Sequence, residues 1–126
     1  MRKIGLLGLL SILMAAGVAL AQDPVKLHPD IYKVEFENSQ VRVMRATLAP
    51  HQKTDLIEMR DTVVVPLTDY ESVIKDPAGK TTEVKRIAGK PAWLAQGSRE
   101  IEARDKTVEA ILIELKSPAK LASPQK

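Results

Sequence analysis

Between residues 31 and 116, hydrophobic residues alternate with polar ones over short stretches that are separated by turn residues. In the first stretch Tyr32, Val34 and Phe36 alternate with charged residues. A period of two places alternate side chains on opposite faces of a strand, so this stretch predicts a half-buried β-strand. By the same reasoning, strands are expected at 31–37, 40–48, 62–68, 71–75, 80–88, 92–95, 99–103 and 108–116.

The connections between these stretches predict an all-β fold. The stretch 40–48 is apolar on both faces, which suggests a strand that crosses between two sheets or carries a bulge. Residues 76–79 read Asp-Pro-Ala-Gly, which is typical of a type I turn and predicts a hairpin. Ahead of the first strand lies a lead-in, 22–30, in which Pro24 and Pro29 disfavour a helix. Short strands at regular spacing indicate a sandwich or barrel.

The first 21 residues have the organisation of a signal peptide. Two basic residues precede the uncharged apolar run 4–18, and Ala19-Leu20-Ala21 matches the small-x-small pattern of a cleavage site. The run is shorter than the roughly 20 residues of a membrane span. We therefore predict cleavage after Ala21, a periplasmic or secreted protein and no stable membrane insertion; an uncleaved anchor is the alternative. The Pro- and Ser-containing tail, 117–126, is expected to be disordered.

Composition excludes several classes of function. The chain contains no cysteine, so thiolate and redox chemistry are excluded. Loss of Arg2 and Lys3 with the signal peptide reduces the 19 basic residues to 17, against 16 acidic ones. A nearly neutral chain with one Trp, two Tyr and one Phe lacks the basic stripe and the stacking platforms of a nucleic-acid-binding protein.

From Lys33 to Lys116 the order of these features resembles the small single-domain bacterial cupins. The resemblance rests on VRVMRATLAPHQK (41–53), DTVVVPLTD (61–69), the turn DPAGK, the segment IAGKPAWLAQGS and the closing strand EAILIELK (109–116). It implies a cupin-like double-stranded β-helix, a jelly-roll barrel, over residues 31–116. In that family a His-containing loop and a second motif ending in His surround a divalent metal.

The metal-binding motifs of the family are degenerate in this chain. The resemblance places Ile57 and Met59 where the H-x-H pair stands, and the chain has no His after His51. The candidates for the second motif, after Gly97, are Ser98, Arg99 and Glu100, depending on register. Isoleucine cannot bind a metal, and a methionine thioether is a soft ligand that suits mainly copper(I). We therefore predict no bound metal and no cofactor, and the metal chemistry of the family is not carried over.

Several residues are candidates for a ligand pocket in the barrel. Ile57 and Met59 either fill the core or line a dry pocket for an apolar or amphipathic ligand. Trp93 is interpreted as a core anchor or a pocket wall. The loop with Asp55, Glu58, Arg60 and Asp61 is either solvated, or its Glu58 forms a polar rim at the barrel mouth with Arg99 or Glu100 that binds an ionic group. The complete set of pocket candidates is Ile57, Glu58, Met59, Trp93, Arg99 and Glu100.

Three functions remain open at this stage. The first is a metal-free, cupin-like module that binds a small molecule or a partner, and that forms a homodimer. The second is a metal-independent isomerase or lyase using Glu58, Glu100 or His51 as acid or base. Such an enzyme needs two of these groups within about 3 Å of a common point. The third is a structural envelope protein with a solidly packed barrel and no small ligand.

Overall fold

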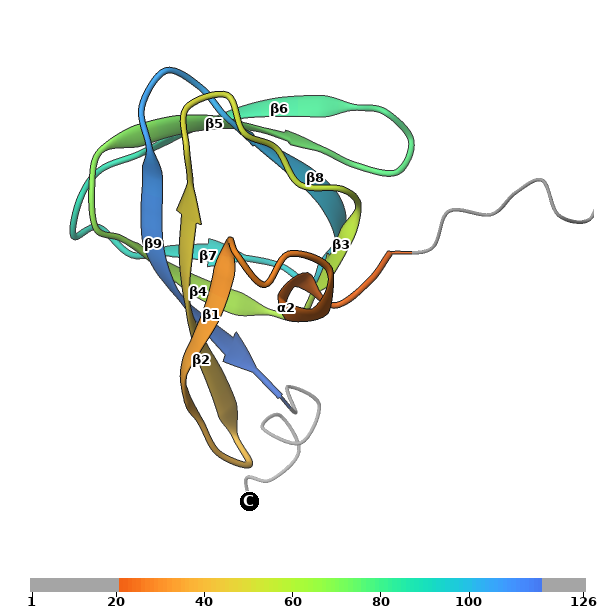
Figure 1. Cartoon of the computed structure of the whole chain (residues 1–126), viewed down its shortest axis with the longest axis vertical. Helices are drawn as coiled ribbons and strands as arrows, with labels where there is room; N and C mark the ends of the chain where they lie inside the picture. The colour runs from red at the N-terminus through yellow and green to blue at the C-terminus, as the bar shows by residue number, and fades with distance from the viewer. Residues whose placement is uncertain (1–20, 117–126) are drawn as a thin grey trace, which may run out of the picture.

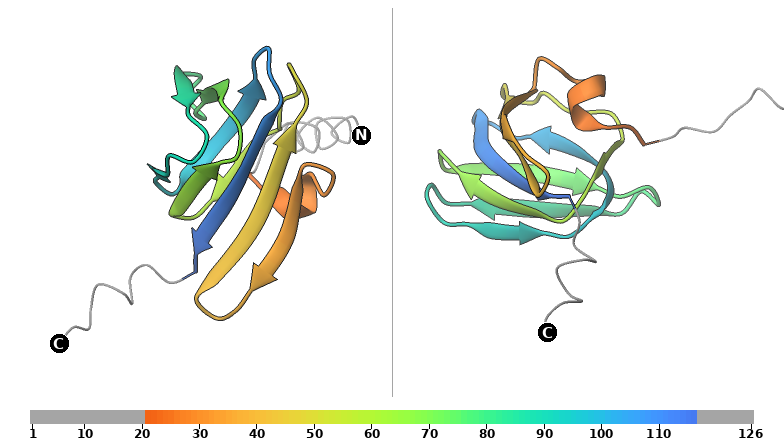
Figure 2. Two further views of the ribbon diagram at one scale, coloured as in Figure 1. Left: turned by 90° about the vertical axis from the view of Figure 1, so that its left-hand side faces the viewer. Right: turned by 90° about the horizontal axis from the view of Figure 1, so that it is seen from below.

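A computed structural model describes residues 21–116, so the expected signal peptide, Ala21 excepted, and the tail 117–126 lie outside the described residues. The described part forms nine strands in two antiparallel sheets (Figures 1 and 2). They are β1 (Tyr32–Glu37), β2 (Val41–Leu48), β3 (Ile57–Met59), β4 (Thr62–Pro66), β5 (Tyr70–Lys75), β6 (Thr81–Arg86), β7 (Ala92–Leu94), β8 (Gly97–Ala103) and β9 (Val108–Leu115).

The two sheets face each other across the core. The five-stranded sheet has the order β1-β2-β9-β4-β7, and the four-stranded sheet has the order β3-β8-β5-β6. Seen from below, the two layers lie one over the other (Figure 2, right). Apart from the hairpin pairs β1–β2 and β5–β6, neighbours in each sheet are not consecutive in sequence, as in a jelly roll, and this arrangement confirms the all-β double-stranded β-helix.

The core is built from the inner faces of both sheets. In β9 the residues Val108, Ala110 and Leu112 are buried and alternate with half-exposed neighbours, as the period of two predicts. Two other inner-face residues, Met44 and Leu48 of β2, are fully buried. A buried side chain of this size contributes roughly 1.5–3 kcal/mol relative to an exposed one. Within residues 21–116, no helix has the length and apolar character that crossing a bilayer requires.

The lead-in contains a short helix, α2 (Pro24–Leu27), so the expectation that its prolines exclude a helix is wrong. Pro24 occupies the first turn, where its missing N–H would have no intrahelical partner anyway. The side chain of Asp23 caps this turn by accepting hydrogen bonds from the backbone N–H groups of Val25 and Lys26.

A bulge in β1 changes which of its side chains are buried. Val34 pairs with Met44 and Phe36 pairs with Val43, which leaves Glu35 as the extra residue. The bulge therefore lies in β1 rather than in the predicted strand 40–48, which stays within one sheet. The extra residue turns Phe36 to the outer face, where it is 54% exposed. Only Tyr32 of the alternating apolar residues is buried, so the prediction of a half-buried strand is wrong for the rest of β1.

The hairpin between β5 and β6 is confirmed together with its turn. The Gly79 N–H donates to the carbonyl of Asp76 at 2.9 Å, and the Asp76 carboxylate accepts from two further N–H groups of the turn. Gly79 has φ +93°, a conformation that favours glycine. The short strand β3 lies inside the segment that was expected to be a loop, because its three residues are too few to show a period.

Candidate functional site

A small cavity lies between the inner faces of the two sheets. Its volume is about 50 Å³, and most of its wall is apolar, including the side chain of Met59. The polar residues in the wall are Tyr32, Tyr70, Ser72 and Arg86, and no Asp or Glu lines it. A dry cavity of about 150 Å³ is known to bind benzene, so this one accommodates only a group of a few heavy atoms.

Ile57 and Met59 are both inward-facing core residues on β3. They are 0% and 1% exposed, and Met59 lines the cavity. The intervening residue, Glu58, points to the opposite side of the strand and is exposed. The two positions that the cupin resemblance assigns to metal ligands therefore contribute to packing.

Arg99 is buried on the inner face of β8. It pairs with Ile57 across the β3–β8 ladder and is only 9% exposed. Its Nη2 donates to the carbonyl of Ala95 at 2.6 Å, whereas its Nη1 is buried and has no hydrogen-bond partner. Burial lowers the pKa of Arg99, and the neighbouring Tyr32 offsets this effect in part. An arginine stays protonated even so, and the site therefore holds a dehydrated positive charge.

The two buried tyrosines stay neutral over the physiological pH range. Burial raises the pKa of Tyr32, and the nearby Tyr70 raises it further. Burial also raises the pKa of Tyr70, against the opposing effect of Arg86. Of the ion pairs formed between residues 21 and 116, none includes Arg86 or Arg99. Arg99 thus has no carboxylate partner among residues 21–116, whereas Arg86 also lines a surface hollow that contains Asp69, Glu71 and Asp105.

The expected polar rim does not form from Glu58 with Arg99 or Glu100. Glu58 pairs with Ser98, and its side chain points away from the inward-facing Arg99. It lines an open hollow of about 380 Å³ together with Asp23 and other polar residues. Glu100 alternates with Arg99 along β8 and lines a separate groove of about 80 Å³. The structure therefore places these candidates at different surfaces.

Trp93 lies on the outer face of β7 and is 55% exposed, so the expectation of a core anchor is wrong. Its neighbours Ala92 and Leu94 take the inner face, and Leu94 lines the cavity. Side chains alternate between the two faces of a strand, so when Ala92 and Leu94 point inward, Trp93 between them must point outward.

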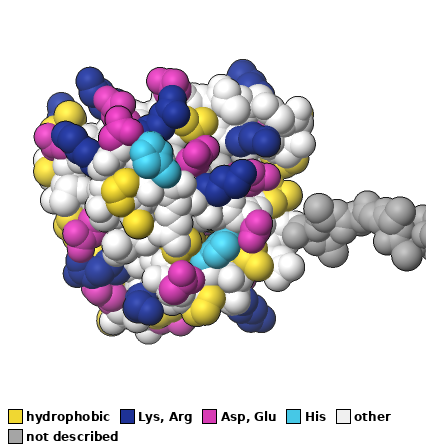
Figure 3. All heavy atoms as spheres, turned by 45° about the horizontal axis from the view of Figure 1, so that its top comes forward, with side chains coloured by type: hydrophobic (Ala, Val, Ile, Leu, Met, Phe, Trp, Pro, Cys, Tyr) yellow, Lys and Arg dark blue, Asp and Glu magenta, His cyan; other side chains and the backbone are white. Residues whose placement is uncertain are grey.

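The histidines and carboxylates do not gather into a metal site. Within residues 21–116, there is no group of three or more His, Cys, Asp or Glu side chains that could hold a metal ion. His51 lies 3.3 Å from Asp105, and both side chains are exposed. His28 accepts a hydrogen bond from the backbone N–H of Asp55. On the face shown in Figure 3, side chains of both charges are interspersed rather than gathered by sign.

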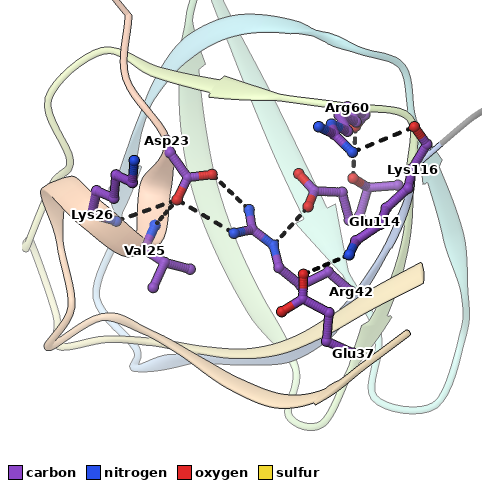
Figure 4. Close-up of polar contacts among 9 residues, drawn as sticks. Asp23, Val25, Lys26, Glu37, Arg42, Arg60, Glu114 and Lys116 are labelled. Atoms are coloured by element: carbon purple, nitrogen blue, oxygen red, sulfur yellow. Dashed lines mark hydrogen bonds and ion pairs between the residues drawn. The ribbon is translucent and has the colours of Figure 1, made fainter. Parts of the chain in front are cut away.

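One buried polar cluster was not foreseen from the sequence, and it links the start of α2 to β2 and β9 (Figure 4). Arg42 Nε lies 2.8 Å from Glu114 Oε1, and Arg42 Nη2 lies 2.8 Å from Asp23 Oδ1. Glu114 is only 3% exposed. The alternation in β9 could have revealed it, because position 114 continues the buried series of Val108, Ala110 and Leu112. An acid at a buried position requires a partner.

This cluster predicts a loss of stability in acid. Burial tends to raise the pKa of Asp23, but the hydrogen bonds and charge of Arg42 hold it below its ordinary value of 3.8. A carboxyl group whose pKa is lower in the folded state than in the unfolded state stabilises the fold at any pH above its unfolded-state pKa. This stabilisation is lost as the pH falls through its folded-state pKa. We expect the melting temperature to fall as the pH drops from about 5 to below 3.8. Asp23→Asn should flatten that fall in a melting series, and an unchanged slope would exclude Asp23 as its source.

Comparison with known structures places this arrangement among the cupins. A cupin domain from Bordetella pertussis Tohama I aligns with a TM-score of 0.63 at 20% identity, covering 79% of this chain and 99% of that one. A cupin family protein with a double-stranded β-helix fold from Methanocaldococcus jannaschii aligns with a TM-score of 0.55 at 9% identity, covering 74% and 85%. A cupin superfamily protein from Desulfitobacterium hafniense DCB-2 gives 0.52 at 14% identity, covering 68% and 75%.

These similarities show the fold. The chain has the cupin fold, a double-stranded β-helix, and the resemblance seen in its sequence is confirmed at that level. No protein-family model matches the sequence. No curated protein matches it either.

Proposed function

We propose that this protein is a metal-free, non-catalytic cupin-like module that binds a small organic molecule inside the barrel. One observation carries the proposal: opposite Ile57, at the position where the cupin resemblance expects metal ligands, lies the buried cation Arg99. A divalent metal placed there would be repelled by the guanidinium and would find no hard ligand on β3. The cavity beside Met59 remains as the place for a ligand.

The geometry gives no support to an acid–base enzyme. A proton transfer needs its acid or base within hydrogen-bond reach of the reacting group. Glu58 and Glu100 face separate surface hollows, and His51 is exposed beside Asp105. None of the three lines the interior cavity. A binding role therefore fits the described residues better than an isomerase or lyase.

The proposed location is the periplasm or the exterior of the cell, on the evidence of the basic start, the apolar run and the Ala19-Leu20-Ala21 pattern. N-terminal sequencing of the protein recovered from its native cells should begin at Gln22. A chain that still begins at Met1 would contradict this proposal.

A thermal-shift screen of small organic molecules and divalent metals tests the binding function. A ligand that binds only the folded state adds about 2.7 kcal/mol of stability at 100 times its dissociation constant, so hits should raise the melting temperature by several degrees. We expect organic hits and no stabilisation by metals. A protein that no organic molecule stabilises would instead fit the structural envelope protein with a packed barrel. Stabilisation by a metal alone would contradict the metal-free proposal.

A further inference from the structure

Arg99 does not itself line the interior cavity, but it lies next to residues that do. Arg99 shares the inner face of β8 with Ile101, which lines the cavity. Tyr32 also lines the cavity, and it is near enough to Arg99 for each to influence the ionisation of the other. A guanidinium has five N–H donors on three nitrogens, and the hydrogen bond to Ala95 uses only the Nη2 nitrogen. The buried Nη1 is thus a donor with no acceptor among the described residues.

A buried, unbalanced cation is rarely retained without a compensating anion. Removing an arginine from water without a paired carboxylate carries a large desolvation penalty. Arg99 cannot avoid that penalty by losing its proton. No carboxylate lines the cavity, although Arg86 in its wall also lines a surface hollow that contains Asp69, Glu71 and Asp105. The unpaired charge of Arg99 therefore favours a negatively charged guest over a neutral one.

The size and polarity of the cavity restrict that guest. A volume of about 50 Å³ with mainly apolar walls admits a few heavy atoms with a short apolar part. Tyr70 and Arg86 line both this cavity and an open surface hollow of about 380 Å³, so they form a wall between the interior and solvent. Side chains of both charges line that hollow, and they are Asp69, Glu71, Lys85, Arg86, Arg104, Asp105 and Lys106.

We propose, resting on the binding function above, that Arg99 is the receptor for the carboxylate of a short aliphatic acid. The carboxylate accepts from Arg99 Nη1, and the alkyl part packs against the apolar walls beside Met59. The carboxylate of the guest then balances the positive charge of Arg99, for which the described residues supply no ion pair.

Isothermal titration with acetate, propionate and butyrate, each matched by its neutral amide, tests this assignment. A hydrogen bond between charged groups is worth a factor of roughly 10 to 100 in affinity, so the acids should bind more tightly than the amides by that factor. Arg99→Met should abolish the difference. Arg45→Met, which removes an arginine that lines neither the cavity nor the surface hollow, should leave it unchanged. Equal affinity for acids and amides, or equal stabilisation by chloride, would overturn the assignment.

Stability without a ligand gives a second, independent result. Arg99→Met should melt at or above the temperature of the unaltered protein, because it removes an unbalanced buried charge from apolar surroundings. A clearly lower melting temperature would show that Arg99 is structural, and would overturn the receptor role. Binding of neutral molecules alone would overturn this inference while leaving the proposed binding function intact. No binding of any small molecule would overturn both.

A separate observation concerns the outer face of the five-stranded sheet, where one apolar row crosses every strand. The ladders pair Phe36 with Val43, Val43 with Ile113, Ile113 with Val63 and Val63 with Trp93. The two aromatic ends are 54% and 55% exposed. This order, which we call the outer row, is nearly palindromic, with Ile113 at its centre.

We infer that the outer row is the contact surface of a homodimer. A two-fold axis lying in the interface and passing by Ile113 places the row of one copy on the row of the other, as an isologous contact requires. If the axis runs along β9, Phe36 faces the partner's Trp93. Next to the row, Arg45 is bonded to Glu35 and Glu109, which leaves one net negative charge there and no strong attraction for a highly charged partner.

The area available is of the order that a dimer needs. Five strands about 4.8 Å apart, with eight residues in the longest strands, give a sheet face of about 19 by 27 Å. A standard interface buries roughly 800 Å² of accessible surface per partner, so a dimer would have to cover nearly all of this face, whose projected area is about 500 Å². Two aromatic side chains at the ends of the row match the composition of such interfaces.

Sedimentation equilibrium and cysteine cross-linking test the dimer. The mass should be twice that of one chain, and Phe36→Ser or Trp93→Ser should raise the dimer dissociation constant at least tenfold. Ile87→Ser removes an exposed apolar side chain outside the row and should have no effect. Because the chain has no cysteine, Ile113→Cys should form a disulfide-linked dimer on oxidation, and Lys85→Cys on the other sheet should not. A mass equal to that of one chain would overturn the inference. A monomer that binds lipid vesicles or another protein through this row would overturn it as well.

Discussion

Replacing Arg42 by methionine should lower the free energy of unfolding by about 3–5 kcal/mol, the usual cost of breaking a buried ion pair. The variant keeps the length of the side chain but leaves the carboxylate of Glu114 buried without its cation. It also frees Asp23 at the start of α2, although this contribution is smaller because the Asp23 side chain is partly exposed. Urea denaturation, followed by circular dichroism, measures the loss.

The double variant Arg42→Met with Glu114→Leu is the matched control. Removing both charges should restore most of the lost stability, because apolar residues of similar volume replace a buried ion pair at little cost. A single variant that loses less than about 1 kcal/mol, as an exposed pair would, would show that water reaches Glu114. The ion pairs of Arg42 would then not hold the lead-in against the barrel.

Replacing Ile57 by alanine should cost about 2–5 kcal/mol, because its side chain is completely buried and the change leaves a cavity. Met59→Ala should cost a similar amount for the same reason. Glu58→Ala, between them on the exposed side of β3, should change stability by no more than about 0.5 kcal/mol. Guanidinium chloride denaturation of the three variants measures this alternation.

The difference in stability loss between Glu58→Ala and the other two variants tests the role of the β3 residues. A large effect at Ile57 and Met59 with none at Glu58 would show that the positions which the cupin resemblance assigns to metal ligands stabilise the core. If Ile57→Ala and Met59→Ala were tolerated like Glu58→Ala, these two side chains would not belong to the core. The inner face of the barrel would then have to be built differently from the structure described above.

Much of the fold was predictable because it depends on local patterns. The alternation in β9 and the Asp76–Gly79 turn each act over a few residues, so a period of two and a turn motif identify them. The bulge at Glu35 was not predictable, since a bulge depends on how the partner strand pairs. The outward orientation of Phe36 follows from it.

The candidate site was predictable only in part. Ile57, Met59 and Arg99 could be singled out through the cupin resemblance, because they occupy motif positions. Which of Ser98, Arg99 and Glu100 faces inward depends on register, and the pairing of Arg99 with Ile57 settles it. The cluster of Arg42 with Asp23 and Glu114 joins residues far apart in sequence, which no local pattern connects.

Native mass spectrometry of the protein purified without added metal or chelator tests the central claim most directly. The claim is that Ile57, Met59 and Arg99 have replaced the cupin metal site by an apolar core and a fixed cation. We expect chains without a divalent metal, either unliganded or carrying a light organic acid. One equivalent of a divalent metal per chain, lost on denaturation, would contradict the claim.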